Sequence, residues 1–193
     1  MGEDLSVKDA IDERDAAECS SVSRAGGFHE SLSGGAPSHW FGEGGLMSSS
    51  NRPYAGDVTP EDAWAALGAD GASALVDVRT VAEWSFVGVA DLGSLGKSPL
   101  FQEWQSYPTM QVDGGFADRV AEALAAGGVT PETPVFFLCR SGARSQAAAA
   151  ALTGRGFSQC FNILGGFEGP LDGARHRGGT SGWKADGLPW MQS

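Results

Sequence analysis

The sequence is poor in basic residues and in cysteine, and it contains no long hydrophobic run. Thirteen Lys and Arg residues face 24 Asp and Glu residues among 193, giving a formal net charge of -11. This balance argues against nucleic acid or an anionic membrane as a partner, because both select for basic surfaces. The richest apolar run, residues 147–152, is far shorter than the roughly 18 residues of a membrane span. Three cysteines do not form the even set of a disulfide framework, so we expect a reducing, cytoplasmic compartment.

Histidine is also scarce, and glycine is in excess. His29, His39 and His176 share no metal-ligand spacing, so we expect no metal site. The 29 glycines are about twice the usual share, but they follow no Gly-x-y period, which excludes a collagen-like chain. The remaining alternatives for this composition are a loop-rich domain and a disordered segment.

The N-terminal quarter differs from the rest of the chain. Residues 1–46 contain nine acidic and three basic residues, several Gly-Gly and Ser-Ser pairs and few aliphatic residues. Such a composition does not offset the entropy cost of ordering, so we expect residues 1–46 to be disordered. Acidic residues at positions 3 and 4, with no apolar segment after them, argue against a secretory signal. We predict an acidic extension over 1–53 and a globular domain over 54–193; a natural translation start at Met47 is the alternative.

From residue 54 onward, helical and strand patterns alternate. Thr59 and Pro60 are typical of a helix start, and Gly68 is expected to stop that helix. Thr80 is expected to cap a turn. Residues 86–113 are hard to assign, and their aromatic residues Phe101, Trp104 and Tyr107 suggest a strand or a packed loop. The alternation predicts an α/β domain of three layers, with a mostly parallel central sheet flanked by helices. The predicted helices are residues 60–67, 115–126 and 144–153, and the predicted strands are 74–79, 135–138 and 159–163.

The segment Cys139-Arg140-Ser141-Gly142-Ala143-Arg144-Ser145 follows the most apolar strand and opens a helix. Free backbone N–H groups and the helix dipole make such a junction an anion site, at the end of the sheet where ligands bind. This field is expected to favour the thiolate of Cys139. Gly142 permits a sharp turn around the sulfur, and Arg140 and Arg144 add two permanent positive charges. We therefore interpret Cys139 as a nucleophile, with an inert buried cysteine as the alternative.

The other two cysteines have plainer interpretations. Cys160 lies inside a predicted strand and is expected to be a core residue. Cys19 lies in the predicted disordered extension and is interpreted as incidental. The six tryptophans are expected to pack in the core or in a lid rather than to stack on nucleobases.

Residues from about 55 to the end resemble a single-domain rhodanese. The resemblance is carried by five segments: Asp77-Val78-Arg79, Glu83-Trp84, the Cys139–Ser145 loop, Asn162-Ile163-Leu164-Gly165-Gly166-Phe167, and Gly187-Leu188-Pro189-Trp190. The family usually continues its Glu-aromatic pair with Gly-His-Ile-Pro-Gly-Ala. Here the chain reads Ser85-Phe86-Val87-Gly88-Val89-Ala90, so the local course of this loop is not implied by the resemblance.

The resemblance implies a sulfurtransferase without a metal or organic cofactor. Cys139 would take a sulfane sulfur from a small anionic donor such as thiosulfate, forming a persulfide, and pass it to a thiol or cyanide acceptor or to a protein. The backbone amides of Arg140, Ser141, Gly142, Ala143 and Arg144 would surround the outer sulfur, and the two arginines would hold the donor. Asp77, Arg79 and Glu83 would support the loop by ion pairing.

Two alternatives share the same loop chemistry. A non-enzymatic persulfide carrier or regulatory domain would need the same residues, so the sequence does not separate it from an enzyme. A cysteine-dependent phosphatase or arsenate reductase would place five residues before the arginine, whereas four separate Cys139 from Arg144. Finally, residues 168–182 are interpreted either as a flap in which Arg175 and Arg177 bind an anionic acceptor, or as a plain surface loop.

Overall fold

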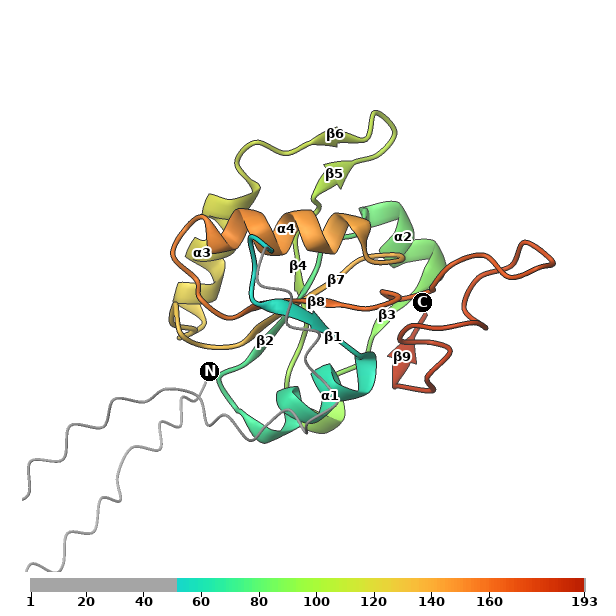
Figure 1. The fold of residues 1–193 in the computed structure, drawn as a ribbon, viewed down its shortest axis with the longest axis horizontal. Helices are drawn as coiled ribbons and strands as arrows, with labels where there is room; N and C mark the ends of the chain where they lie inside the picture. Colours follow the sequence, from blue (N-terminus) through green and yellow to red (C-terminus); the bar gives the residue numbers. More distant parts are fainter. Residues whose placement is uncertain (1–51, 193) are drawn as a thin grey trace, which may run out of the picture. The chain divides into compact units, whose positions relative to one another are not determined.

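The computed structural model describes residues 52–192. The expectations of a disordered segment over 1–46 and of a natural start at Met47 therefore lie outside the described residues. The described part is built on one five-stranded sheet in which every neighbouring pair is parallel (Figure 1). Its strand order is β1 (Gly56–Val58), β8 (Cys160–Ile163), β7 (Val135–Leu138), β2 (Ala74–Asp77) and β4 (Leu100–Phe101).

Helices cover both faces of this sheet, which confirms the predicted three-layer α/β architecture (Figure 1). Helix α1 packs on one face, and α3 and α4 pack together on the other. Helix α2 follows the end of β2, beside the carboxyl ends of the central strands. The bounds are α1 (Pro60–Ala69), α2 (Val81–Val87), α3 (Phe116–Ala126) and α4 (Ala143–Thr153).

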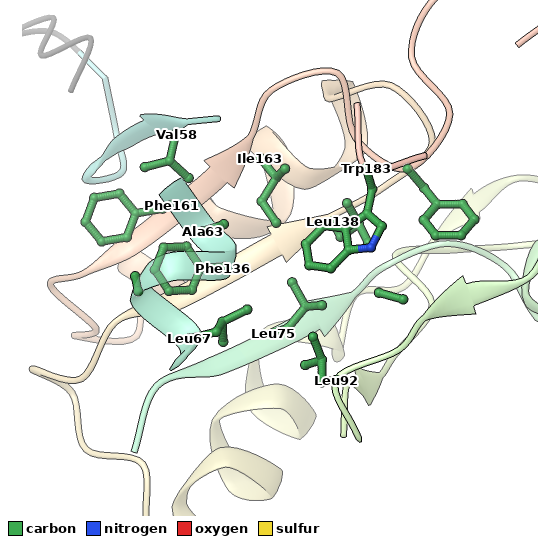
Figure 2. Close-up of a cluster of buried hydrophobic side chains, with 13 residues drawn as sticks. Val58, Ala63, Leu67, Leu75, Leu92, Phe136, Leu138, Phe161, Ile163 and Trp183 are labelled. Carbon is green, nitrogen blue, oxygen red and sulfur yellow. The ribbon is translucent and has the colours of Figure 1, made fainter. Parts of the chain in front are cut away.

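Two hydrophobic clusters separate the layers, and strand β7 contributes to both. Phe136 and Leu138 face the α1 side, where they meet Leu75, Ile163 and Trp183 (Figure 2). The alternate residues Val135 and Phe137 face α3 and α4. All four β7 side chains are fully buried. A strand buried on both faces is expected in the middle of a parallel sheet, and it fixes where the following residue, Cys139, leaves the sheet.

The structure corrects the predicted elements in a few places. Helix α1 continues through Gly68 to Ala69, and Asp70 is its C-cap, so Gly68 does not stop it. The expected strand over 74–79 is shorter, because β2 ends at Asp77. The edge strand β1 was not predicted; it pairs with β8 through residues 56–58.

The segment left unassigned, residues 86–113, contains the end of α2 and several very short elements. They are β3 (Val89–Ala90), a 3-10 turn (Gly93–Leu95), β4, β5 (Gln105–Ser106) and β6 (Gln111–Val112). Strands β5 and β6 form an antiparallel hairpin that projects from the body of the fold (Figure 1). Strand β3 pairs with β9 (Trp190–Met191), which ties the C-terminal segment to the residues after α2. Within residues 52–192 no helix has the length and hydropathy needed to cross a membrane.

Candidate active site

Cys139 leaves the sheet directly after β7 and lies at the start of a four-residue connection to α4. The residue is only 1% exposed, and its Sγ accepts a hydrogen bond from the backbone N–H of Gly142 at 3.0 Å. Gly142 has a φ of +111°, a conformation that side chains other than glycine rarely adopt, so the loop can curl around the sulfur. Helix α4 begins at Ala143, and the N–H groups of its first turn have no partner within the helix. The local geometry therefore favours a negative charge on or next to the sulfur.

The turn after β8 is joined to this loop by backbone hydrogen bonds. The N–H of Phe167 donates to the carbonyl of Cys139 at 2.7 Å, and the N–H of Glu168 donates to the carbonyl of Arg140 at 3.0 Å. Gly166 has a φ of +59°, and a Cβ on it would collide with the Cys139 carbonyl oxygen and the neighbouring backbone. The Gly-Gly-Phe turn and the cysteine loop are thus packed backbone against backbone.

A chain of buried polar side chains runs from the sulfur to the edge strand β1. The Ser145 hydroxyl lies 3.2 Å from Cys139 Sγ, 2.9 Å from the Gly142 carbonyl and 2.6 Å from Asn162 Oδ1. Asn162 Nδ2 in turn donates to Asp57 Oδ1 at 2.9 Å. A hydroxyl carries a single proton, so the three acceptors around Ser145 compete for it. Ser145 can therefore donate to the sulfur only when it releases Asn162 and Gly142.

Glu83 and Arg144 form a two-pronged ion pair beside the loop. Arg144 Nη1 and Nη2 donate to the two carboxylate oxygens of Glu83 at 2.7 and 2.6 Å. Glu83 also accepts from the N–H of Thr80, which completes a capping box at the start of α2. Burial alone would raise the pKa of Glu83, but hydrogen bonds from Arg144 and Thr80 outweigh it and lower this pKa to about 2. Much of the positive charge of Arg144 is therefore balanced within the site.

Asp77 and Arg79 form a second ion pair, which is completely buried. Arg79 Nε lies 2.9 Å from Asp77 Oδ1, and both side chains have no exposed area. The guanidinium also donates to the Gly88 carbonyl at 2.9 Å and lies 4.0 Å from the centre of the Phe167 ring. This pair contacts the residues that flank the cysteine loop, namely the end of α2 and the Gly-Gly-Phe turn.

Cys139 opens into a pocket of about 560 Å³. Of the residues predicted for the site, Cys139, Arg140, Ser141, Ala143, Arg144 and Glu83 line it, whereas Gly142, Asp77 and Arg79 do not. Arg177 also lines the pocket, and its Nη1 donates to the Gly169 carbonyl at 2.6 Å. Arg175, which the flap hypothesis paired with Arg177, is exposed and does not line the pocket.

Several residues of the site were not found by reasoning from the sequence. Tyr107 and Met110 of the β5–β6 hairpin line the pocket, although residues 86–113 had no assigned element. Asp57 and Asn162 reach the cysteine only through strand pairing, because their Cα atoms are partners in the β1–β8 ladder. Ser145 did carry a local signal, since a hydroxyl one residue past Arg144 lies on the first turn of the helix that begins at the loop.

Two further features of the described residues concern possible metal ligands and the second cysteine. Between residues 52 and 192 no three His, Cys, Asp or Glu side chains cluster in a way that could hold a metal ion. Cys160 is buried in the core cluster under α3 and α4, and burial raises the pKa of its thiol to about 11. Cys139 is thus the cysteine that combines a pocket, a backbone N–H and nearby arginines. These features place a cysteine, with a backbone N–H and arginines beside it, at the carboxyl end of the sheet of an α/β protein.

Comparison with known proteins places the chain within this class. Residues 59–170, more than half of the chain, match the family model of the rhodanese-like domain, and the chain belongs to that family. The crystal structure of Rv0390 from M. tuberculosis is 45% identical with a TM-score of 0.63, covering 72% of this chain and 99% of that one.

Curated relatives of the chain come from several Rickettsia species. The uncharacterized RP600 homolog of Rickettsia rickettsii is 38% identical over 117 residues, which are 61% of this chain and 81% of the relative. The uncharacterized protein RP600 of Rickettsia prowazekii is 35% identical over the same shares of both chains.

Proposed function

We propose that the protein is a sulfurtransferase that carries a sulfane sulfur on Cys139. Membership of the rhodanese-like family supports sulfur transfer in general terms. The single observation that carries the proposal is the position of Cys139, which lines a pocket and whose Sγ lies 3.0 Å from the Gly142 amide nitrogen. An anionic sulfur at this place is stabilised by the backbone N–H groups of the loop and by the N-terminus of α4.

The donor half-reaction needs only a thiolate and a sulfane sulfur. The Cys139 thiolate attacks the outer sulfur of thiosulfate, the S–S bond of thiosulfate breaks, and sulfite leaves with the electron pair. The product is a Cys139 persulfide, whose negative outer sulfur lies among the loop amides. Arg140, which is exposed and lines the pocket, favours the approach of the anionic donor.

In the acceptor half-reaction, cyanide or a thiolate attacks the outer sulfur of the persulfide. The Cys139–sulfur bond breaks, and the Cys139 thiolate is regenerated with the electron pair. Neither half-reaction needs a metal or an organic cofactor, because sulfur serves as both nucleophile and leaving group.

Mass spectrometry after exposure to thiosulfate tests the proposal directly. One added sulfur increases the mass by about 32 Da, and we expect this adduct on Cys139 in the wild type and none in Cys139→Ser. Cys160→Ala is the matched control, since Cys160 is buried away from the pocket, and it should keep the adduct. A wild-type protein that gains no sulfur on Cys139 would reject the proposal.

Steady-state turnover separates an enzyme from a persulfide carrier. With thiosulfate and cyanide, an enzyme releases many equivalents of sulfite per protein. A carrier releases one equivalent and then stops until a protein partner accepts the sulfur. We expect many turnovers, because the pocket is open to small acceptors beside the sulfur.

A further inference from the structure

Two hydrogen-bond donors reach Cys139 Sγ within residues 52–192, and they differ in kind. The N–H of Gly142 lies 3.0 Å from the sulfur and belongs to the backbone, so its direction is fixed by the loop. The Ser145 hydroxyl lies 3.2 Å from the sulfur, and its hydrogen can rotate toward different acceptors. Ser145 is fully buried, so bulk water does not compete for this hydrogen. The Ser145 hydrogen can therefore follow a change of charge on the sulfur, which the Gly142 N–H cannot do.

A neutral acceptor for the same hydroxyl is held in place by the neighbouring strands. Ser145 Oγ lies 2.6 Å from Asn162 Oδ1 and 2.9 Å from the Gly142 carbonyl oxygen. The Asp57 carboxylate accepts from Asn162 Nδ2 and is also paired with Arg52. A carboxylate paired with an arginine only accepts hydrogen bonds, so the Asn162 amide must present Nδ2 to Asp57 and Oδ1 to Ser145. Ser145 thus has a second place for its hydrogen whenever the sulfur does not attract it.

The proposed sulfur exchange changes the charge on Sγ. In the free thiolate the negative charge is on Cys139 Sγ, whereas in the persulfide it is on the outer sulfur. A hydrogen bond to a charged acceptor is about twice as strong as one between neutral groups. The Ser145 hydrogen is therefore expected on the sulfur in the thiolate, and on Asn162 or Gly142 in the persulfide.

Resting on the proposed function, we propose that Ser145 is a catalytic residue whose hydroxyl turns toward Cys139 Sγ as the persulfide is discharged. When cyanide attacks the outer sulfur, the bond between the two sulfurs breaks and Sγ takes the electron pair. The hydroxyl donates to this growing charge and so stabilises the leaving group. The products are thiocyanate and the Cys139 thiolate. Ser145 keeps its hydrogen throughout, so the step needs no oxidant, reductant or proton transfer.

The same hydrogen bond acts differently when the cysteine is loaded with sulfur. The Cys139 thiolate is then the nucleophile, and a donor to Sγ stabilises the thiolate and lowers its nucleophilicity. Without the Ser145 hydroxyl, attack of the thiolate on thiosulfate should be unchanged or slightly faster, whereas discharge should be slower. A residue that only supports the loop would slow both half-reactions to a similar degree. The asymmetry between the half-reactions therefore distinguishes a donor to the leaving sulfur from structural support.

Single-turnover rates of the two half-reactions in Ser145→Ala test this inference. Loading is the gain of about 32 Da in excess thiosulfate, and discharge is its loss from the loaded protein in excess cyanide, both followed by quenched-flow mass spectrometry. Loading is measured across the ordinary titration of a thiol, with its pKa of about 8.5, and is compared where it no longer rises with pH. There the fraction of thiolate does not enter the comparison. We expect loading within about twofold of the wild type and discharge about three- to tenfold slower.

Thr153→Val is the matched control on the same helix. Thr153 is the last residue of α4, and its hydroxyl donates to the Ala149 carbonyl at 2.9 Å, so both rates should match the wild type. Unfolded molecules lower the amplitudes of both reactions and leave the ratio of the two rates unchanged. The charged residues that line the pocket with Cys139 are the same in all three proteins, namely Glu83, Arg140, Arg144, Glu168 and Arg177.

The outcomes separate this inference from the proposed function. If the persulfide forms on Cys139 but both rates change by the same factor in Ser145→Ala, or neither changes, the role of Ser145 is rejected and sulfur transfer stands. Loading that is lost, or slowed more than discharge, would reject it as well. An equal change in Thr153→Val would also reject it, because the effect would belong to the helix. If the wild type gains no sulfur from thiosulfate, both proposals fall.

Discussion

Arg144 is neutralised within the site by Glu83, and this pairing decides how the residue acts. Its guanidinium is oriented by two hydrogen bonds of 2.6–2.7 Å, so it stiffens the junction between α2 and the cysteine loop. Arg140 and Arg177 also line the pocket, and among the described residues neither forms a salt bridge of this kind. A paired arginine of this kind positions the loop, whereas an unpaired one would bind the donor.

Replacing Glu83 by Gln tests this role. Gln keeps the capping box at α2 but removes the ion pair with Arg144. We expect a loss of about 2–3 kcal/mol in the free energy of unfolding at pH 7, because a pKa lowered from 4.5 to about 2 corresponds to stabilisation of that order. Urea denaturation of both proteins measures it.

The pH dependence of this loss of stability is the control for the Glu83→Gln experiment. The folded-state pKa of Glu83 lies below the unfolded one, so its contribution is fully present above about pH 5 and disappears as the pH falls toward 2. The difference between wild type and Glu83→Gln should therefore shrink between pH 5 and pH 3. A difference that stays constant over this range would contradict the ion-pair origin.

Some residues near the sulfur could be predicted from the sequence and others could not, and the difference has a physical reason. Cys139, Arg140 and Arg144 are contiguous, so a strand followed by a helix is enough to bring them to one site. Asp57 and Asn162 are 105 residues apart, and their contact depends on β1 pairing with β8. Local sequence patterns carry no information on that pairing, because β1 is a three-residue edge strand.

At the scale of elements, the β1–β8 contact is stabilised by one buried polar pair. Asp57 and Asn162 are register partners, and Asn162 is fully buried. Asn162→Asp would place two carboxylates side by side, so we expect a loss of about 3–5 kcal/mol in the free energy of unfolding. Exchanging the two residues, as Asp57→Asn with Asn162→Asp, restores one carboxylate and one amide and should recover at least half of that loss.

Chemical denaturation of the two single variants and the double variant measures the coupling between these positions. Additive losses would show that the pair does not join β1 to β8. Sulfite release by the same proteins reports whether the Ser145 hydroxyl, which donates to Asn162 or to the sulfur, is disturbed as well. The double variant should recover stability more completely than activity, because a carboxylate at 162 competes more strongly for the Ser145 proton.

The turn after β8 is the second element on which the site depends. Gly166→Ala adds a Cβ that collides with the backbone of residues 139–141 and is also strained at a φ of +59°. We expect a loss of about 2–5 kcal/mol in stability and a large fall in kcat/KM, since the cysteine loop must move. Thermal unfolding and sulfite release measure the two effects.

Gly156→Ala provides the matched comparison for this turn. Gly156 also has a positive φ, +98°, but a Cβ there would contact nothing within 4 Å. This variant should lose only the conformational part, about 1–2 kcal/mol, and should keep the wild-type kcat/KM. Equal kcat/KM values in the two variants would mean that the turn does not position the loop.

The strands and helices that carry long apolar patterns were predicted from the sequence, and the short ones were not. Strand β7 and helix α3 have buried faces that are visible as a continuous apolar run and as helical spacing. Between residues 88 and 112 each strand has two residues, too few to show alternation. The wall of the pocket formed by Tyr107 and Met110 therefore appears only in three dimensions.

For the whole molecule, the net charge and the glycine content are averages over regions that differ from one another. The chain carries a net charge of -11, yet three arginines and two glutamates line the pocket. The average predicts a protein unsuited to bulk polyanions, whereas the arginines of the pocket would suit a small anion. Composition thus limits partners at the scale of the surface and says little about a single pocket.

The last prediction concerns the whole chain, namely what its first 46 residues contribute to stability and activity. The strands and helices described above, both hydrophobic clusters and the pocket are formed by residues from Arg52 onward. A chain that starts at Met47 keeps the Arg52–Asp57 ion pair and has the length of an ordinary domain. We expect its melting temperature to lie within about 2 °C of that of the full chain, which is no more than the smallest shift of a 1 kcal/mol change, roughly 2–4 °C. Its kcat/KM should be unchanged.

A chain that starts at Pro60 is the control. It lacks β1 and Asp57 and should lose both stability and activity, because β8 and Asn162 then lose their partners. If the Met47 start also lost activity, residues 1–46 would have a role in catalysis that the fold of residues 52–192 does not supply.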